Sequence, residues 1–208
     1  EKMKPWELFN HIWKVDYKKS GFDLDWLVEV DDDEKKVRVL FCPSNSNKDW
    51  FINIAGFLPV VKFPFLMCWG WKSVFDGCKG LILEELLREI NLHPDYTVEI
   101  CGHSYGGAVS IICGIELCKV SGIKADVITF GAPMPLFLLW SKFLSRAYLG
   151  NVVQYAHWSD CVTYCPPILG FHQVKAKRIG KFSFKGLFHS EVYHMSYGEK
   201  KLYPEDAI

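Results

Sequence analysis

The sequence has no excess of charge of either sign. Its 208 residues include 24 Lys and Arg and 24 Asp and Glu, so the formal net charge is zero. A neutral chain lacks the long-range field that draws proteins to nucleic acid or to an anionic membrane. We therefore expect no nucleic-acid partner, and neutral or apolar partners fit the composition better.

Long hydrophobic runs are also missing. A helix needs about 20 consecutive apolar residues to span a bilayer, and Lys62 interrupts the most apolar region, residues 57–71. The sequence therefore predicts no transmembrane segment.

Metal-binding motifs are absent although the chain holds eight cysteines, because no CxxC pair and no Cys/His cluster has zinc spacing. We expect no metal and no cofactor. Cys101, Cys113 and Cys118 lie in apolar segments, and a chain of this length does not need a disulfide scaffold. Reduced, mostly buried thiols favour a cytoplasmic location. The alternative is a secreted protein, since Glu1 stands first and a signal peptide can have been removed.

Repeats, low-complexity tracts and linkers are absent as well, so we expect a single domain over residues 1–208. What is present is an alternation of strand-like and helix-like segments. Helices are expected within 1–19 and over 74–91, 108–120 and 138–148. Strands are expected over 24–30, 36–42, 96–101, 126–130 and 151–156, with further alternation over 171–184. The first two strands form an antiparallel hairpin, and the rest predict an α/β fold with a mainly parallel sheet covered by helices on both faces.

Ser104 lies in the run Gly102-His103-Ser104-Tyr105-Gly106, between a predicted buried strand and a predicted helix. A GxSxG run in this context is typical of a nucleophile elbow, where a tight turn leaves no room for side chains at the two glycines. The alternative is a glycine-rich turn that only joins strand and helix. A serine nucleophile also needs a base, a carboxylate and donors for the oxyanion.

Four segments in chain order resemble the class 3 lipases, the fungal-type family of the α/β-hydrolase superfamily. The run Gly102–Ala108 is similar to the family's GHSLGGA elbow, and Phe130–Pro133 resembles its FGxP run. Ser159–Val162 with Pro166-Pro167 resembles NDxV…LPP, and His194–Tyr197 is similar to the terminal HxxY. The resemblance covers the chain from about Val37 to Tyr197.

The resemblance implies a catalytic triad of Ser104, Asp160 and His194, in the Ser…Asp…His order of α/β-hydrolases. His189 is the alternative base, and His157 also lies near Asp160 in the sequence. Asp126 opens a strand and is better read as a cap or turn residue. His103 is expected to pack beside the nucleophile in a structural role.

The family's oxyanion loop, FRGT or FRGS followed by DW, aligns with Phe41–Ser44 and Asp49-Trp50. It implies the backbone N–H of Tyr105 and Ser44 as oxyanion donors, although Ser44 can also be a plain turn serine. The chain departs from the family at Cys42 and Pro43, which stand where Arg and Gly are usual, and proline fixes φ near about −65°. A lid is implied over residues 45–57, with Trp50, Phe51 and Ile54 as substrate-binding candidates; the alternative is that these side chains fill the core.

These residues predict a serine esterase or lipase that hydrolyses carboxylic esters, acylglycerols or phospholipids, through an acyl-enzyme and with transient contact to a lipid interface. One alternative is a thioesterase or peptidase with the same triad, because one fold hosts many chemistries. The other is a catalytically weak scaffold, which the altered residues Cys42 and Pro43 favour and the intact triad disfavours.

Overall fold

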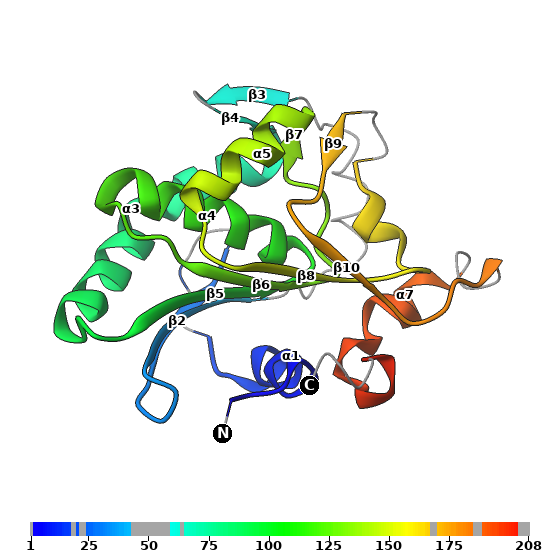
Figure 1. The fold of residues 1–208 in the computed structure, drawn as a ribbon, viewed down its shortest axis with the longest axis horizontal. Coiled ribbons are helices and arrows are strands. Elements are labelled where there is room, and N and C mark those ends of the chain that lie inside the picture. The colour runs from blue at the N-terminus through cyan, green and yellow to red at the C-terminus, as the bar shows by residue number, and fades with distance from the viewer. Residues whose placement is uncertain are drawn as a thin grey trace.

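The fold is seen in a computed structural model that describes residues 2–17, 20, 24–42, 59–62, 65–166, 170–184 and 189–203. A six-stranded sheet runs through the molecule in the order β1-β2-β5-β6-β8-β10 (Figure 1). Its strands are β1 (Trp26–Asp31), β2 (Lys36–Phe41), β5 (Thr97–His103), β6 (Asp126–Phe130), β8 (Val152–His157) and β10 (Ala176–Ile179). Only β1 is antiparallel to its neighbour; the other five strands are parallel. The expected entry hairpin and mainly parallel sheet are therefore confirmed.

Helices cover both faces of this sheet, as Figure 1 shows. On one face lie α3 (Trp69–Leu92), α4 (Tyr105–Ser121) and α5 (Leu139–Tyr148), and on the other lies α1 (Pro5–Lys14). Successive residues of a strand point to opposite faces of the sheet. Val39 therefore packs with α3 and α4, and its neighbour Leu40 packs with α1. The last described elements lie below the sheet: α7 (Ser190–His194) and then two short 3-10 turns, Ser196–Gly198 and Lys200–Leu202.

Two predicted helices begin earlier than expected. The helix predicted over 74–91 starts at Trp69, because Trp71 is buried and extends the apolar face beyond the leucine pattern. The helix predicted over 108–120 starts at Tyr105. Gly106 and Gly107, expected in a turn, belong to its first turn.

A second, four-stranded sheet has the order β3-β4-β7-β9, with every pair antiparallel. Its strands are β3 (Pro59–Lys62), β4 (Phe65–Cys68), β7 (Leu136–Phe137) and β9 (Phe171–His172). The alternating region 171–184 is therefore divided between two sheets, since β9 joins this one and β10 joins the main one. A period of two identifies a strand, but partner choice depends on contacts distant in sequence.

No helix among the described residues is long and apolar enough to cross a membrane. Of the eight cysteines, Cys68, Cys78, Cys101 and Cys113 are buried as free thiols, half of the set rather than most of it. The single-domain organisation over residues 1–208 and the cytoplasmic location stay predictions.

Candidate active site

The carboxyl ends of three neighbouring parallel strands bring the predicted site residues to one edge of the sheet. Ser104 follows β5 directly, Gly131 follows β6, and Asp160 comes three residues after β8. In an open parallel sheet, this edge is where ligands bind. Strand order therefore gathers residues that are 56 positions apart in the sequence.

Ser104 sits in a backbone conformation that side-chain-bearing residues rarely adopt. Its φ is 56° and its ψ is −127° at the start of α4. Such a conformation costs on the order of 1–3 kcal/mol and persists only where the surroundings enforce it. Here the Ser104 N–H donates to the carbonyl of Phe130 at 2.8 Å, which ties the turn to the neighbouring strand β6.

Close backbone packing explains the two glycines of the elbow. A Cβ atom on Gly102 would lie 2.4 Å from the carbonyl carbon of Gly106, and one on Gly106 would lie 3.0 Å from Phe41. Any larger residue would force strand and helix apart. The contact with Phe41 also places the end of β2, and Cys42 after it, beside the elbow.

Asp160 and His194 form a buried hydrogen-bonded pair. His194 Nδ1 lies 2.8 Å from Asp160 Oδ2, and the carboxylate is fully buried. Its other oxygen, Oδ1, accepts the backbone N–H of Val162 at 3.0 Å. His194 keeps 9% of its surface exposed. Because Nδ1 is hydrogen-bonded to the carboxylate, Nε2 is the imidazole nitrogen that remains to accept a proton.

Tyr197 also contacts this carboxylate. Its hydroxyl donates to Asp160 Oδ2 at 2.7 Å and accepts the backbone N–H of His157 at 2.9 Å. Burial, and then the negative charge of Asp160, hold the pKa of Tyr197 well above its usual range, so the hydroxyl stays a donor. From the HxxY run, the sequence predicted a role for His194 alone. The tyrosine of the same run, Tyr197, contacts the same carboxylate.

Gly131 makes room for this cluster. Its φ is 57°, and a Cβ there would lie 2.9 Å from Asp160 Oδ2, His194 Nδ1 and Tyr197 Cε2. Sequence reasoning used Gly131 only as part of the FGxP run and missed this role. A positive φ with three side chains at that distance admits glycine alone.

His103 lies behind the candidate base. Its Nε2 is 2.8 Å from the backbone carbonyl of His194, and the two imidazole rings are 4.4 Å apart. Since a carbonyl only accepts, Nε2 carries the hydrogen. Burial, and then the proximity of His194, hold the pKa of His103 well below its usual range, so the ring is neutral. The expected position beside the nucleophile agrees with these contacts.

The other candidate residues lie elsewhere. His189 is exposed at the start of α7, and His157 accepts the Ser159 N–H at Nδ1 and lies against the Tyr193 ring. Asp126 accepts the Asn151 N–H at 2.7 Å at the opposite end of β6, which fits a turn residue. The structure therefore brings Asp160 together with His194 and not with His189.

Two parts of the expected catalytic site are less complete: the hydrogen bond between Ser104 and His194, and the oxyanion and lid residues. Among the described residues, Ser104 Oγ makes no hydrogen bond to His194. The residue before Ser104, His103, does pack against the His194 ring. Catalytic hydrogen bonds are often long without substrate. Tyr105 opens α4, where N–H groups point out of the helix end. Ser44, Trp50, Phe51 and Ile54 lie outside the described residues.

No group of three His, Cys, Asp or Glu side chains is placed to hold a metal ion in the part of the chain that the structure describes. The side chains of the Ser104, Asp160 and His194 cluster are suited to proton transfer and nucleophilic attack.

Comparison with known proteins agrees with this arrangement. The model of the family "Lipase (class 3)" matches residues 38–170. A lipase of Rhizomucor miehei is 27% identical over 99 residues, which cover 46% of this chain and 27% of that protein. A putative lipase of Saccharomyces cerevisiae is 28% identical over 123 residues, covering 50% and 37%. The matched part is well under half of each relative.

Solved structures show the same fold. The triacylglyceride lipase of Rhizomucor miehei superposes with a TM-score of 0.72 at 21% identity, covering 80% of this chain and 66% of that one. A lipase of Rhizopus microsporus var. chinensis gives 0.71 at 17% identity, covering 88% and 67%. The main sheet is thus that of the α/β-hydrolases, as expected. Because the family model spans most of the chain, from β2 to the loop before β9, this protein belongs to the class 3 lipase family.

Proposed function

We propose that this protein is a serine esterase or lipase in which Ser104, His194 and Asp160 act as the catalytic triad. The observation that carries the proposal is the buried hydrogen bond between Asp160 and His194, beside a serine held at a φ of 56°. Support also comes from the family and from a triacylglycerol lipase of similar fold, described as having a serine protease triad at its catalytic centre.

In this mechanism the Ser104 hydroxyl attacks the ester carbonyl carbon while His194 Nε2 takes the hydroxyl proton. Asp160 holds the imidazole by Nδ1 and stabilises its positive charge. The backbone N–H of Tyr105 and Ser44 donate to the oxyanion. His194 then returns the proton to the departing alcohol, and water repeats the sequence on the acyl-enzyme to release the acid.

The substrate class within this reaction is an acylglycerol or a phospholipid. A lid formed by residues 45–57, with Trp50, Phe51 and Ile54, would contact the acyl chain. A substrate panel of glycerides, phospholipids, aryl esters, thioesters and peptides on one preparation separates this from a thioesterase or a peptidase.

Replacement of Ser104 by Ala tests the proposal. We expect hydrolysis of a short p-nitrophenyl ester to fall by roughly three orders of magnitude or more, because the nucleophile is lost. A fluorophosphonate probe should label the wild type and not Ser104→Ala.

The matched control is Ser121→Ala at the far end of α4, where the hydroxyl donates to the Leu117 carbonyl and accepts the Ile123 N–H, away from the candidate site. Its activity and labelling should equal those of the wild type. Unchanged hydrolysis by Ser104→Ala, or a wild type that the probe does not label, would refute the triad and favour a catalytically idle scaffold.

A further inference from the structure

Charge is unevenly distributed along this neutral chain. Residues 127–190 hold seven Lys and Arg residues but a single acidic one, Asp160, which is fully buried against His194. The balancing acidic residues lie before and after this stretch, the next being Glu191 on α7. The described surface of residues 127–190 therefore presents cationic side chains and no carboxylate.

The same stretch carries nearly all of the exposed aromatic side chains among the described residues: Trp140, Phe143, Trp158, Tyr164, Phe182 and Phe184, with Trp69 the exception. Single exposed apolar residues are ordinary. Their concentration in the part of the chain that lacks exposed acids is not explained by the fold.

Four of these rings and two cations lie in the segments that flank Asp160 and follow β10. We define the 158–184 patch as Trp158, Tyr164, Arg178, Lys181, Phe182 and Phe184. The Arg178 guanidinium lies 4.3 Å from the centroid of the Tyr164 ring and 5.6 Å from that of Trp158. Its Nη1 donates to Thr163 Oγ1 at 2.8 Å. Arg178 is thus fixed between two rings.

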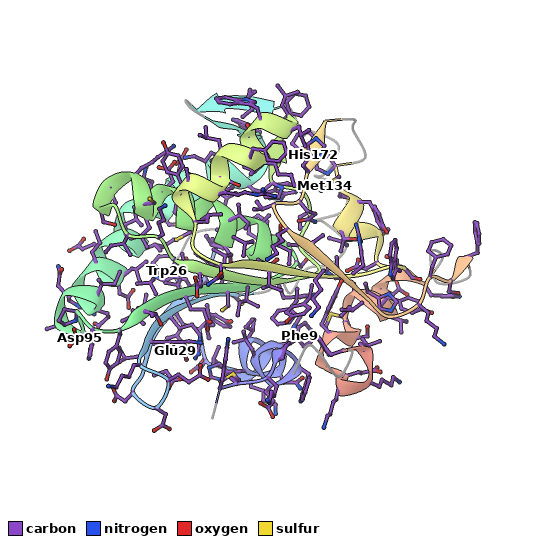
Figure 2. All side chains as sticks on the ribbon, viewed as in Figure 1. Phe9, Trp26, Glu29, Asp95, Met134 and His172 are labelled. Carbon is purple, nitrogen blue, oxygen red and sulfur yellow. The ribbon has the colours of Figure 1, made fainter. Side chains whose placement is uncertain are left out.

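Phe182 and Phe184 extend the patch. Their rings meet edge to face at 5.2 Å, and they are 51% and 76% exposed. Between them, the Ser183 N–H donates to Ser159 Oγ at 3.0 Å, which ties this segment to the loop that holds Asp160. Figure 1 shows the chain after β10 turning outward beside α7, and Figure 2 shows side chains projecting there from the body of the molecule.

We propose that the 158–184 patch docks the protein on the surface of an anionic phospholipid bilayer. Exposed aromatic rings insert at the boundary between headgroups and acyl chains, and Lys and Arg beside them attract anionic lipids. Such a surface suits a membrane better than a nucleic acid, because the two phenylalanines carry no hydrogen-bonding group and stand next to a site proposed for lipid esters. The zero net charge of the whole chain does not oppose this, since screening confines the attraction to about 8 Å.

This inference rests on the proposed function, because docking would bring the site to its lipid substrate. Binding itself is measured without catalysis. Ser104→Ala protein is sedimented with vesicles of phosphatidylcholine alone and with vesicles that also contain phosphatidylserine. We expect binding to the second kind only, weakening as salt is added.

Two variants in the Ser104→Ala background locate the surface. Lys181→Gln should weaken binding about fivefold, the value for one cation near an anionic surface. Phe182→Ser with Phe184→Ser should weaken it by roughly tenfold or more. Arg88→Gln and Leu92→Ser, exposed on α3, are the matched controls and should bind like the parent.

The inference is overturned by equal binding to neutral and anionic vesicles, by no binding, or by control variants that lose as much as the patch variants. It is also overturned if a single-stranded oligonucleotide binds as tightly and with the same dependence on Phe182 and Phe184. If the double variant does not fold, the single variant Phe184→Ser takes its place. To check folding, the same substitutions are made in protein that keeps Ser104, and hydrolysis of a soluble ester is measured. Binding without ester hydrolysis by the wild type refutes only the proposed function, and hydrolysis without binding refutes only the docking.

Discussion

At the scale of single residues, the candidate site is organised around one carboxylate. Asp160 accepts three hydrogen bonds, from His194, Tyr197 and the Val162 N–H, and is fully buried. A buried charge is tolerated only where such donors satisfy it. Any change that removes a donor therefore alters both the stability of the site and the position of the imidazole.

Tyr197→Phe removes one of these donors and keeps the ring. We expect kcat for a soluble ester to fall by about tenfold with little change in KM, since a lost hydrogen bond to a buried charge costs about 1–3 kcal/mol.

Tyr203→Phe is the matched control for that variant. Its hydroxyl is also buried and donates to the Tyr197 carbonyl at 2.7 Å, but it does not contact Asp160. It should lower stability and leave kcat unchanged. An equal fall in kcat for both variants would assign Tyr197 a structural role only.

At the scale of elements, α1 supports the site from the face of the sheet opposite α4. Phe9 is buried, and its ring lies 5.1 Å from the ring of His103, 5.5 Å from Phe130 and 5.8 Å from Tyr197. Figure 2 labels Phe9 between α1 and the sheet. Through His103, which binds the His194 carbonyl, the packing of α1 reaches the candidate base.

Phe9→Ala should therefore lower the free energy of unfolding by about 3–5 kcal/mol and also reduce kcat at a temperature where the variant is folded. Urea unfolding and ester hydrolysis measure the two effects. Phe75→Ala, fully buried on α3, creates a comparable cavity in the other core and is the control. Equal kcat for Phe9→Ala and Phe75→Ala would show that α1 contributes stability alone.

Element prediction from the sequence succeeded where periodicity was strong. The helices over 74–91 and 108–120 and the strands over 126–130 and 151–156 are present, with ends shifted by a few residues. For residues 171–184 the alternation indicated strands, and β9 and β10 lie there, but alternation does not specify which sheet a strand joins. The small sheet of β3, β4, β7 and β9 was not predicted at all, since two of its strands have only two residues.

At the scale of the whole molecule, burial of neutral imidazoles links stability to pH. Burial lowers the pKa of His103 and of His157 below the usual value. The unfolded chain then binds protons near pH 6.5 that the folded chain does not, so stability falls as pH falls below about 6.5. Asp31, Glu34 and Glu116, whose pKa values are also lowered, act in the same direction only near pH 4 and below.

Urea unfolding measured at several values between about pH 7.5 and 5 tests this. The free energy of unfolding should decrease toward the acid end, by at most about 1.4 kcal/mol per pH unit for each histidine. His103→Gln should reduce that slope, because Gln does not titrate. An identical slope in His103→Gln and wild type would contradict the assignment to His103.

The sequence by itself determined the elbow at Ser104 and the order of Ser104, Asp160 and His194, because close packing and chain order are local or linear properties. The sequence favoured His194 over His189 only through the family resemblance. The tertiary structure places His194, and not His189, against Asp160, because it fixes how α7 packs beside the loop after β8. Elements distant in sequence also produce the other features of the site. These are the hydrogen bonds donated by Tyr197 and His103, the space at Gly131 and the 158–184 patch. A pattern of residues records which groups are available; packing decides which of them meet.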